Sequence, residues 1–307
     1  MVTAVYTHDD CLGHVTPDGH PERVGRMLAV ERGLAGLDVA RLAAPIGEDA
    51  DVLRCHPARY LARVRAAVPE AGLVQMDGDT FLSPGSLNAA LRAVGGVCAA
   101  VDAVMAGEAR NAFVGCRPPG HHAERETAMG FCLFGTVAIA AKRALDHHGL
   151  SRVAIVDFDV HHGNGTQDLL WDEARCLFVS SHQMPLYPGS GAMEERGAHG
   201  QIMNIPLKAG TGGQEMWRVW EPALERVLAF SPDLILISAG FDAHRDDPLG
   251  GLKWRDTDFS WLTGAICGVA DECCAGRVVS VLEGGYDLDA LASSVAAHVG
   301  ELVRHNG

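Results

Sequence analysis

The sequence lacks most of the features that mark nucleic-acid-binding, membrane-spanning or secreted proteins. It has no run of Lys and Arg and its formal net charge is −14, so we expect no nucleic acid partner that binds through a basic surface. No apolar stretch reaches the roughly 18 residues that a membrane-spanning helix needs. Residues 1–10 contain neither a basic region nor a long apolar core. We therefore expect neither membrane attachment nor a targeting segment.

The nine cysteines do not show the C-x-x-C spacing of structural zinc sites. Most stand among apolar neighbours, as Cys98, Cys116 and Cys267 do, and this is typical of reduced, buried thiols in a cytoplasmic protein. Hydrophobic residues at 48% supply a large core, and no linker, repeat or low-complexity segment divides the chain. We expect a cytoplasmic protein in which residues 1–307 form one domain. The sequence leaves the oligomeric state open.

Apolar runs that resemble buried strands alternate with segments of helical periodicity. This alternation predicts an α/β fold, with a parallel sheet and helices on both of its faces. An irregular loop is expected at residues 71–83. Strands are predicted at residues 2–6, 112–116, 153–157, 176–180, 201–207, 233–240 and 277–282, and helices at residues 22–34, 56–68, 84–107, 131–148, 214–229, 257–272 and 288–303.

One stretch, residues 153–165, combines an apolar run with metal-ligand side chains. Asp157, Asp159 and His161 alternate with other residues, so in a strand they share one face. Such a run resembles the carboxyl end of a buried parallel strand, and α/β sheets bind ligands beside these ends. Taken alone, the stretch also suits a strand that ends in a solvated acidic turn.

Polar segments follow four of the predicted strands, at residues 117–122, 157–164, 240–247 and 283–286. Because carboxyl ends of parallel strands lie at one edge of a sheet, we expect these segments to meet. A catalytic metal site needs three protein ligands and one open position. Asp159, His161 and Asp242 supply two carboxylates and one imidazole, which suit zinc and also Fe(II) or Co(II). The alternative for Asp242 is a turn-forming side chain.

The other polar residues at these strand ends suit acid–base chemistry. His121 and His122 follow a rigid Pro-Pro-Gly turn, and adjacent histidines can transfer protons if each has its own partner. Asp157 and Asn164 are available as those partners. Tyr286 follows two glycines and could donate a hydrogen bond to a developing oxyanion. The alternatives are a structurally hydrogen-bonded histidine pair and a tyrosine that packs on the last helix.

Together these residues resemble the zinc-dependent histone deacetylase superfamily, which includes bacterial histone-deacetylase-like amidohydrolases and acetylpolyamine amidohydrolases. The resemblance extends from the segment GHPERVGR at 19–26 to Tyr286. It looks closer to class II than to class I because Asn164 stands where class I has aspartate. The other motifs are RPPGHHAERETAMGFC at 117–132, VDFDVHHGNG at 156–165, SAGFDAHRDDPLGG at 238–251 and LEGGYDL at 282–288.

The resemblance implies a single-domain arginase/deacetylase fold and one Zn²⁺ ion held by Asp159, His161 and Asp242. The zinc would polarise the substrate carbonyl and activate a water. Structural K⁺ is also frequent in the family, and here it would be held by the backbone of residues 157, 159 and 161 together with Ser180. Arg26 resembles an arginine that lies deep behind the site.

The resemblance also implies a role for each acid–base residue. His122 matches the histidine that takes the proton of the water and later gives one to the leaving amine, and Asn164 would orient it. His121, paired with Asp157, matches its electrostatic partner. Tyr286 matches the tyrosine that stabilises the oxyanion opposite the metal.

Five further residues are implied to contact the substrate. Gly130 and Phe131 match one wall of the acyl-lysine tunnel. Tyr187 matches the other wall, where the family usually has phenylalanine. Asp79 resembles a residue that contacts the substrate amide, and Leu249 lies at the rim. After residue 134 the family usually has asparagine, whereas this chain has Gly135 and Thr136, and long insertions typical of acetylpolyamine amidohydrolases are absent.

Three functions compete. The first is removal of acetyl or another short acyl group from lysine or small acyl-amides, and the second is acetylpolyamine deacetylation. Leu249 favours the first, because polyamine-selective relatives can place a glutamate there, while Asp79 and the acidic surface favour the second. The third is a silent acyl-binding module, but no residue of the catalytic set is missing. Val160 and His162 replace the extra carboxylates that a dinuclear, arginase-like site would need.

Overall fold

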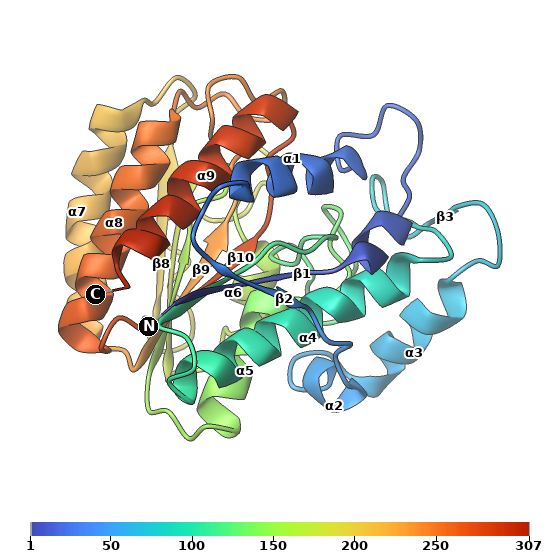
Figure 1. The fold of residues 1–307 in the computed structure, drawn as a ribbon, viewed down its shortest axis with the longest axis horizontal. Coiled ribbons are helices and arrows are strands. Elements are labelled where there is room, and N and C mark those ends of the chain that lie inside the picture. Colours follow the sequence, from blue (N-terminus) through green and yellow to red (C-terminus); the bar gives the residue numbers. More distant parts are fainter. Residues whose placement is uncertain (1, 307) are drawn as a thin grey trace.

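A parallel sheet of eight strands forms the centre of the protein in the computed structural model, which describes residues 2–306 (Figure 1). The strands of this sheet are β1 (Thr3–Thr7), β2 (Ala40–Ala43), β5 (Asn111–Val114), β6 (Val153–Asp157), β7 (Cys176–Gln183), β8 (Ile202–Leu207), β9 (Leu234–Ala239) and β10 (Val278–Leu282). They lie in the order β2–β1–β5–β10–β9–β6–β7–β8, and all neighbouring pairs are parallel.

Helices cover both faces of this sheet, each over its own apolar core (Figure 1). One face carries α2 (Asp49–Val52), α3 (Ala58–Ala67), α4 (Ser86–Met105) and α5 (Thr136–Asp146), and the other carries α1 (Gly25–Leu34), α7 (Gly213–Phe230), α8 (Asp256–Cys273) and α9 (Leu288–Arg304). The remaining elements are a 3₁₀ turn at Asp9–Gly13, α6 (Asn164–Leu169) and a small antiparallel pair, β3 (Val74–Gln75) and β4 (Phe81–Leu82). The predicted single α/β domain with a parallel sheet between helices is confirmed.

Helix α4 illustrates how apolar the core is. Among residues 2–306, it is the one helix that is long and apolar enough to cross a membrane, although the sequence had led us to expect no such segment. In the folded protein, 72% of its most apolar window is buried. Gly95 and Gly96 allow this burial, because a Cβ on Gly95 would lie 2.1 Å from the Pro45 carbonyl oxygen. The helix therefore has the pattern of a core helix.

The sheet order brings the four predicted polar segments together. They follow β5, β6, β9 and β10, and these strands are adjacent in the order β5–β10–β9–β6. Because all four run in the same direction, their carboxyl ends lie at the same edge of the sheet. The register aligns Asp157, the last residue of β6, with Ser238 of β9. This edge carries the candidate site.

The sequence misplaced one helix start and missed several short elements. The helix predicted at 131–148 begins only at Thr136, because Phe131 has a positive φ of 69° and the Gly135 amide donates to His56 Nε2 instead of entering a helix. The short β2 is exposed along Arg41 and Leu42, so it has no apolar pattern to reveal it. The loop expected at 71–83 contains β3 and β4, and α2 and α6 were not predicted.

Candidate active site

The three predicted metal ligands lie together at the carboxyl end of β6 and β9. Donor atoms of Asp159, His161 and Asp242 all lie within 4.8 Å of one another, and all three residues are buried. Nδ1 of His161 is 3.1 Å from Asp159 Oδ1 and 3.2 Å from Asp242 Oδ2. The donor set of two carboxylates and one imidazole is one that catalytic zinc sites use.

Backbone amides fix the direction of both carboxylates. The Val160 amide donates to Asp242 Oδ1 at 2.9 Å, and the Gly284 amide donates to Asp159 Oδ2 at 2.8 Å. Gly284 must lack a side chain, because a Cβ there would lie 2.1 Å from Asp242 Oδ2. The glycines of the last motif therefore let the backbone close over the ligand cluster.

The electrostatics of this cluster fit a bound divalent cation. Burial, together with the charge of Asp159, raises the pKa of Asp242 to about 7. Burial opposes a charge on His161, but Asp159 and Asp242 raise its pKa to about 10. Without a metal, the two carboxylates thus hold a proton on His161, and a metal ion would take the place of that proton.

His121 is paired with Asp157 beneath the ligand cluster. Its Nδ1 is 3.0 Å from Asp157 Oδ2, and its Nε2 is 3.8 Å from Asp159 Oδ2. Burial opposes a charge on His121, but Asp159 and Asp157 raise its pKa well above the usual range. His121 therefore carries a positive charge inside the protein, and the carboxylates of Asp157 and Asp159 balance that charge.

His122 has the opposite electrostatic environment. Its Nδ1 is 2.8 Å from Asn164 Oδ1, and Asn164 Nδ2 donates to Glu124 Oε1 at 2.8 Å. Because the Glu124 carboxylate accepts from the amide nitrogen, Asn164 presents its oxygen to His122, so His122 Nδ1 carries the proton. Burial and the charge of His121 lower the pKa of His122 well below the usual range. The neutral ring thus keeps a free acceptor at Nε2.

Tyr286 is buried and remains protonated. Burial raises its pKa well above the usual range, against the effect of Arg26, whose guanidinium carbon lies 5.0 Å from the centre of the Tyr286 ring. Asp247, to which the sequence had given no role, accepts the Tyr286 amide at 2.6 Å and the Leu249 amide at 2.9 Å. The sequence signal that could have identified Asp247 is its position in the motif at residues 238–251.

These residues surround a cavity of about 340 Å³, and His122, His161 and Tyr286 all line it. The cavity is also lined by each of the five predicted substrate contacts, namely Asp79, Gly130, Phe131, Tyr187 and Leu249. Ring centres of Phe131 and Tyr286 are 5.7 Å apart, and those of His122 and Tyr187 are 5.2 Å apart. His20, Pro21 and Leu186 complete the lining and were not predicted.

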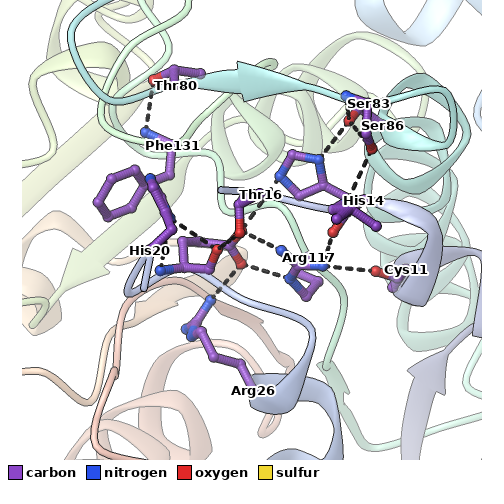
Figure 2. A network of polar contacts seen from close by, with 12 residues as sticks. Cys11, His14, Thr16, His20, Arg26, Thr80, Ser83, Ser86, Arg117 and Phe131 are labelled. Atoms are coloured by element: carbon purple, nitrogen blue, oxygen red, sulfur yellow. Dashed lines mark hydrogen bonds and ion pairs between the residues drawn. The ribbon is translucent and has the colours of Figure 1, made fainter. Parts of the chain in front are cut away.

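A buried ionic network lies behind the cavity, and the sequence gave its central residue no role (Figure 2). Glu22 is fully buried and accepts from Arg117 Nε at 2.6 Å and from Arg26 Nη1 at 3.2 Å. Arg26 also donates to the carbonyls of Glu283 at 2.5 Å and Gly285 at 2.7 Å. The network therefore joins the segment that precedes His121 to the turn that carries Tyr286.

A second group of potential ligands lies at the surface. Asp102, His147 and His148 also approach within 4.8 Å of one another. Both carboxylate oxygens of Asp102 accept hydrogen bonds from Arg143, at 2.8 and 2.6 Å. Asp102 is therefore part of an ion pair with Arg143.

Comparison with known proteins agrees with this geometry. Residues 20–302 match the histone deacetylase domain family. The chain is 40% identical to the histone deacetylase-like amidohydrolase of Pseudomonas aeruginosa over 89% of this chain and 73% of that protein. It is 38% identical to the chloroplastic histone deacetylase 14 of Arabidopsis thaliana, over 95% of this chain and 74% of that protein. The crystal structure of an HDA15 HD domain has a TM-score of 0.93 and 32% identity, with 99% of this chain and 89% of that chain covered.

Proposed function

This chain belongs to the histone deacetylase family, and we propose that it is a zinc-dependent amidohydrolase. It removes acetyl or another short acyl group from the amine of a lysine side chain or of a small acyl-amide. The observation that carries the proposal is that a neutral histidine, one member of the ligand cluster and a protonated tyrosine line one cavity: His122, His161 and Tyr286.

One zinc ion would be held by Asp159, His161 and Asp242, whose donor atoms already face one another. When bound there, the ion supplies Lewis acidity, which polarises the acyl carbonyl and lowers the pKa of the attacking water. A structural K⁺ is proposed at the backbone of residues 157, 159 and 161. Ser180, its fourth partner, is buried and aligned with Asp157 in the β6–β7 register.

We assign the proton transfers of the reaction to His122. Because Asn164 Oδ1 accepts the hydrogen bond from Nδ1–H, Nε2 of His122, a residue that lines the cavity, is the acceptor for a proton of the attacking water. The same nitrogen then donates that proton to the leaving amine. Burial, together with the charge of His121 next to it, lowers the pKa of His122, keeps the ring neutral at rest and so keeps Nε2 free.

Tyr286 stabilises the developing oxyanion. Its high pKa keeps the phenol protonated, so that it can donate a hydrogen bond as negative charge forms on the acyl oxygen. Arg26 and Asp247 hold the turn on which Tyr286 lies, through its carbonyls and its amide respectively. The donor is therefore in place before the substrate binds.

Acetylpolyamine deacetylation is the second candidate. Asp79, whose pKa is raised by burial and by neighbouring Asp77, lines the cavity and would attract a distant ammonium group. Leu249 lines the same cavity and offers no charge. We therefore favour acylated lysine or small acyl-amides, and we propose a cytoplasmic location because the cysteines are all free.

A side-by-side turnover assay tests the function. Zinc-loaded protein is given an acetyl-lysine peptide or an N-acetylated polyamine, and acetate release is measured, with Tyr286→Phe as the control. Faster, Tyr286-dependent release from the peptide supports a lysine deacylase. Faster release from the polyamine would favour the second candidate, and release from neither would refute both as deacetylase substrates.

A further inference from the structure

The tip between β3 and β4, residues 76–80, carries Asp79 into the lining of the cavity. Within residues 2–306, two polar contacts join this tip to segments outside the β3–β4 hairpin. His20 Nε2 lies 3.0 Å from the Asp79 carbonyl oxygen, and the Phe131 amide donates to Thr80 Oγ1 at 3.0 Å. Both partners, His20 and Phe131, themselves line the cavity. The tip is therefore held to the protein by the wall of the substrate site.

The surroundings of His20 fix the direction of its ring. A carbonyl oxygen only accepts, so Nε2 donates to Asp79. On the other side of the ring, Nδ1 lies 3.1 Å from the Glu22 amide nitrogen and 3.0 Å from the Glu22 carbonyl oxygen. Both contacts of Nδ1 are with the backbone of Glu22, and neither changes the donor that Nε2 presents. The segment that begins at residue 20 thus presents a hydrogen-bond donor to the tip.

Thr80 makes a second connection between the tip and the wall. Its buried hydroxyl accepts from the Phe131 amide and donates to Asp79 Oδ1 at 3.3 Å. Phe131 has a φ of 69°, in the left-handed region that costs a bulky residue about 1–3 kcal/mol. The hydrogen bond that the Phe131 amide donates to Thr80 stabilises this conformation, so the position of the tip and the direction of the Phe131 side chain depend on each other.

The His20 ring also packs between the cavity wall, at Phe131, and strand β4, at Phe81. Its centre is 4.8 Å from that of Phe131 and 5.7 Å from that of Phe81 on β4, both in edge-to-face geometry. Figure 2 shows His20 beside Phe131, and Phe131 joined to Thr80. His20 is half-buried, so its replacement does not open the core.

We propose that His20 is a specificity-determining positioning residue, which holds Asp79 at the cavity mouth and Phe131 in the cavity wall as one unit. It selects substrates in which the acylated amine belongs to a longer chain that extends past the mouth to Asp79. The inference rests on the proposed amidohydrolase function and adds a residue that acts through Asp79 without touching the reacting atoms.

The test compares two substrates that share the reacting group. One is an acetyl-lysine peptide, and the other is N-acetylpentylamine, which has the acetyl-lysine side chain without its backbone. His20→Phe keeps the ring and removes the donor, whereas His20→Gln keeps a donor near the position of Nε2. KM is measured for both substrates, or an inhibition constant where the short compound is not turned over.

We expect His20→Phe to raise KM for the peptide about three- to tenfold, which is the contribution of one hydrogen bond. The change in kcat, and the change in KM or in the inhibition constant for N-acetylpentylamine, should be smaller. His20→Gln should restore part of the peptide KM. In an Asp79→Ala background, His20→Phe should add less than about twofold, because the Asp79 side chain that His20 positions is already absent. His147→Ala, an exposed histidine at the end of α5, is the matched control and should leave both substrates unaffected.

Thermal unfolding and zinc content establish that each variant is folded and loaded. An equal loss for both substrates, a loss confined to kcat, or full additivity with Asp79→Ala would overturn the role of His20 while leaving the amidohydrolase proposal intact. Absence of acetate release by the wild-type protein would overturn both.

Discussion

Asn164 presents its amide oxygen, not its nitrogen, to His122, because the nitrogen is held by the carboxylate of Glu124. This relationship decides the tautomer of the proposed base and leaves Nε2 of His122 free to accept a proton. It depends on a residue outside the ligand cluster, and it can be tested through the pH dependence of turnover.

Replacing Asn164 with Asp should move the acidic limb of the kcat/KM profile to higher pH. A carboxylate at this position favours the charged form of His122 and raises its pKa, so a larger fraction of the base is protonated, and therefore inactive, at a given low pH. Glu124→Gln should lower kcat about three- to tenfold with little displacement of this limb, because it loosens the amide without adding a charge next to His122. A limb that stays in place in Asn164→Asp would exclude the proposed pairing.

Tyr286→Phe should lower kcat by a factor that corresponds to about 2–4 kcal/mol, the cost of losing one oxyanion donor. Zinc content should remain at one ion per chain, because Tyr286 is not among the ligands. Metal analysis and steady-state kinetics on the same sample test both statements, and near-wild-type turnover would remove Tyr286 from the mechanism.

Gly284→Ala should abolish stoichiometric zinc. The new Cβ would lie 2.1 Å from Asp242 Oδ2 and 2.6 Å from Asp159 Oδ2, so the two carboxylates would be pushed out of place. Gly268→Ala in α8 is the matched control, since a Cβ there meets nothing within 4 Å and should stabilise the helix by about 1 kcal/mol or less. Full zinc occupancy in Gly284→Ala would contradict the assigned ligand geometry.

Glu22→Gln should destabilise the protein at neutral pH by about 3–5 kcal/mol, because it leaves buried arginines without their carboxylate. Burial works to raise the pKa of Glu22, but Arg117 and His14 hold it well below the usual range. The stabilisation is therefore complete above pH about 4.5 and is lost as the pH falls through the lower, folded-state pKa. Denaturant unfolding between pH 3 and 7 should show a shallower acid dependence in the variant.

Glu31→Gln provides the control for this comparison. Glu31 also pairs with an arginine, Arg41, but both side chains are largely solvated, at 46% and 39% exposure. Such surface pairs contribute about 0–1 kcal/mol, so the free energy of unfolding should hardly change. Equal losses in Glu22→Gln and Glu31→Gln would refute the special role of the buried network.

The ligand cluster and the histidine pair could be predicted because their positions follow from strand ends alone. The sequence placed Asp159 and His161 on one face of a strand, but β6 ends at Asp157 and both residues lie in the segment directly after it. Sheet order then brings Asp242, which follows β9, beside them. The residues themselves indicated Asp157 and Asn164 as partners of the histidines, and the family resemblance assigned one to each. Their geometry, 3.0 Å from His121 to Asp157 and 2.8 Å from His122 to Asn164, matches those expectations.

The remaining site residues lie on loops, where periodicity carries no information. Glu124 and Asp247 stand within recognised motifs, but their contacts depend on turns that sequence spacing does not specify. The positive φ of Phe131, which delays the start of the predicted helix to Thr136, is stabilised by Thr80, a residue 51 positions away. Contacts of this kind are set by tertiary structure, so His20 could not be assigned to the cavity from its sequence neighbourhood.

The position of β10 has a consequence for how the chain acquires activity. Of the strands in residues 2–306, β10 is the last to be synthesised, yet it lies in the middle of the sheet, between β5 and β9. Until it inserts, β2–β1–β5 and β9–β6–β7–β8 are two separate half-sheets, and the histidine pair and the ligand cluster belong to different halves. A ribosome-bound chain that ends before residue 278 therefore lacks the strand that joins the histidine pair to the ligand cluster, and we expect it to release no acetate.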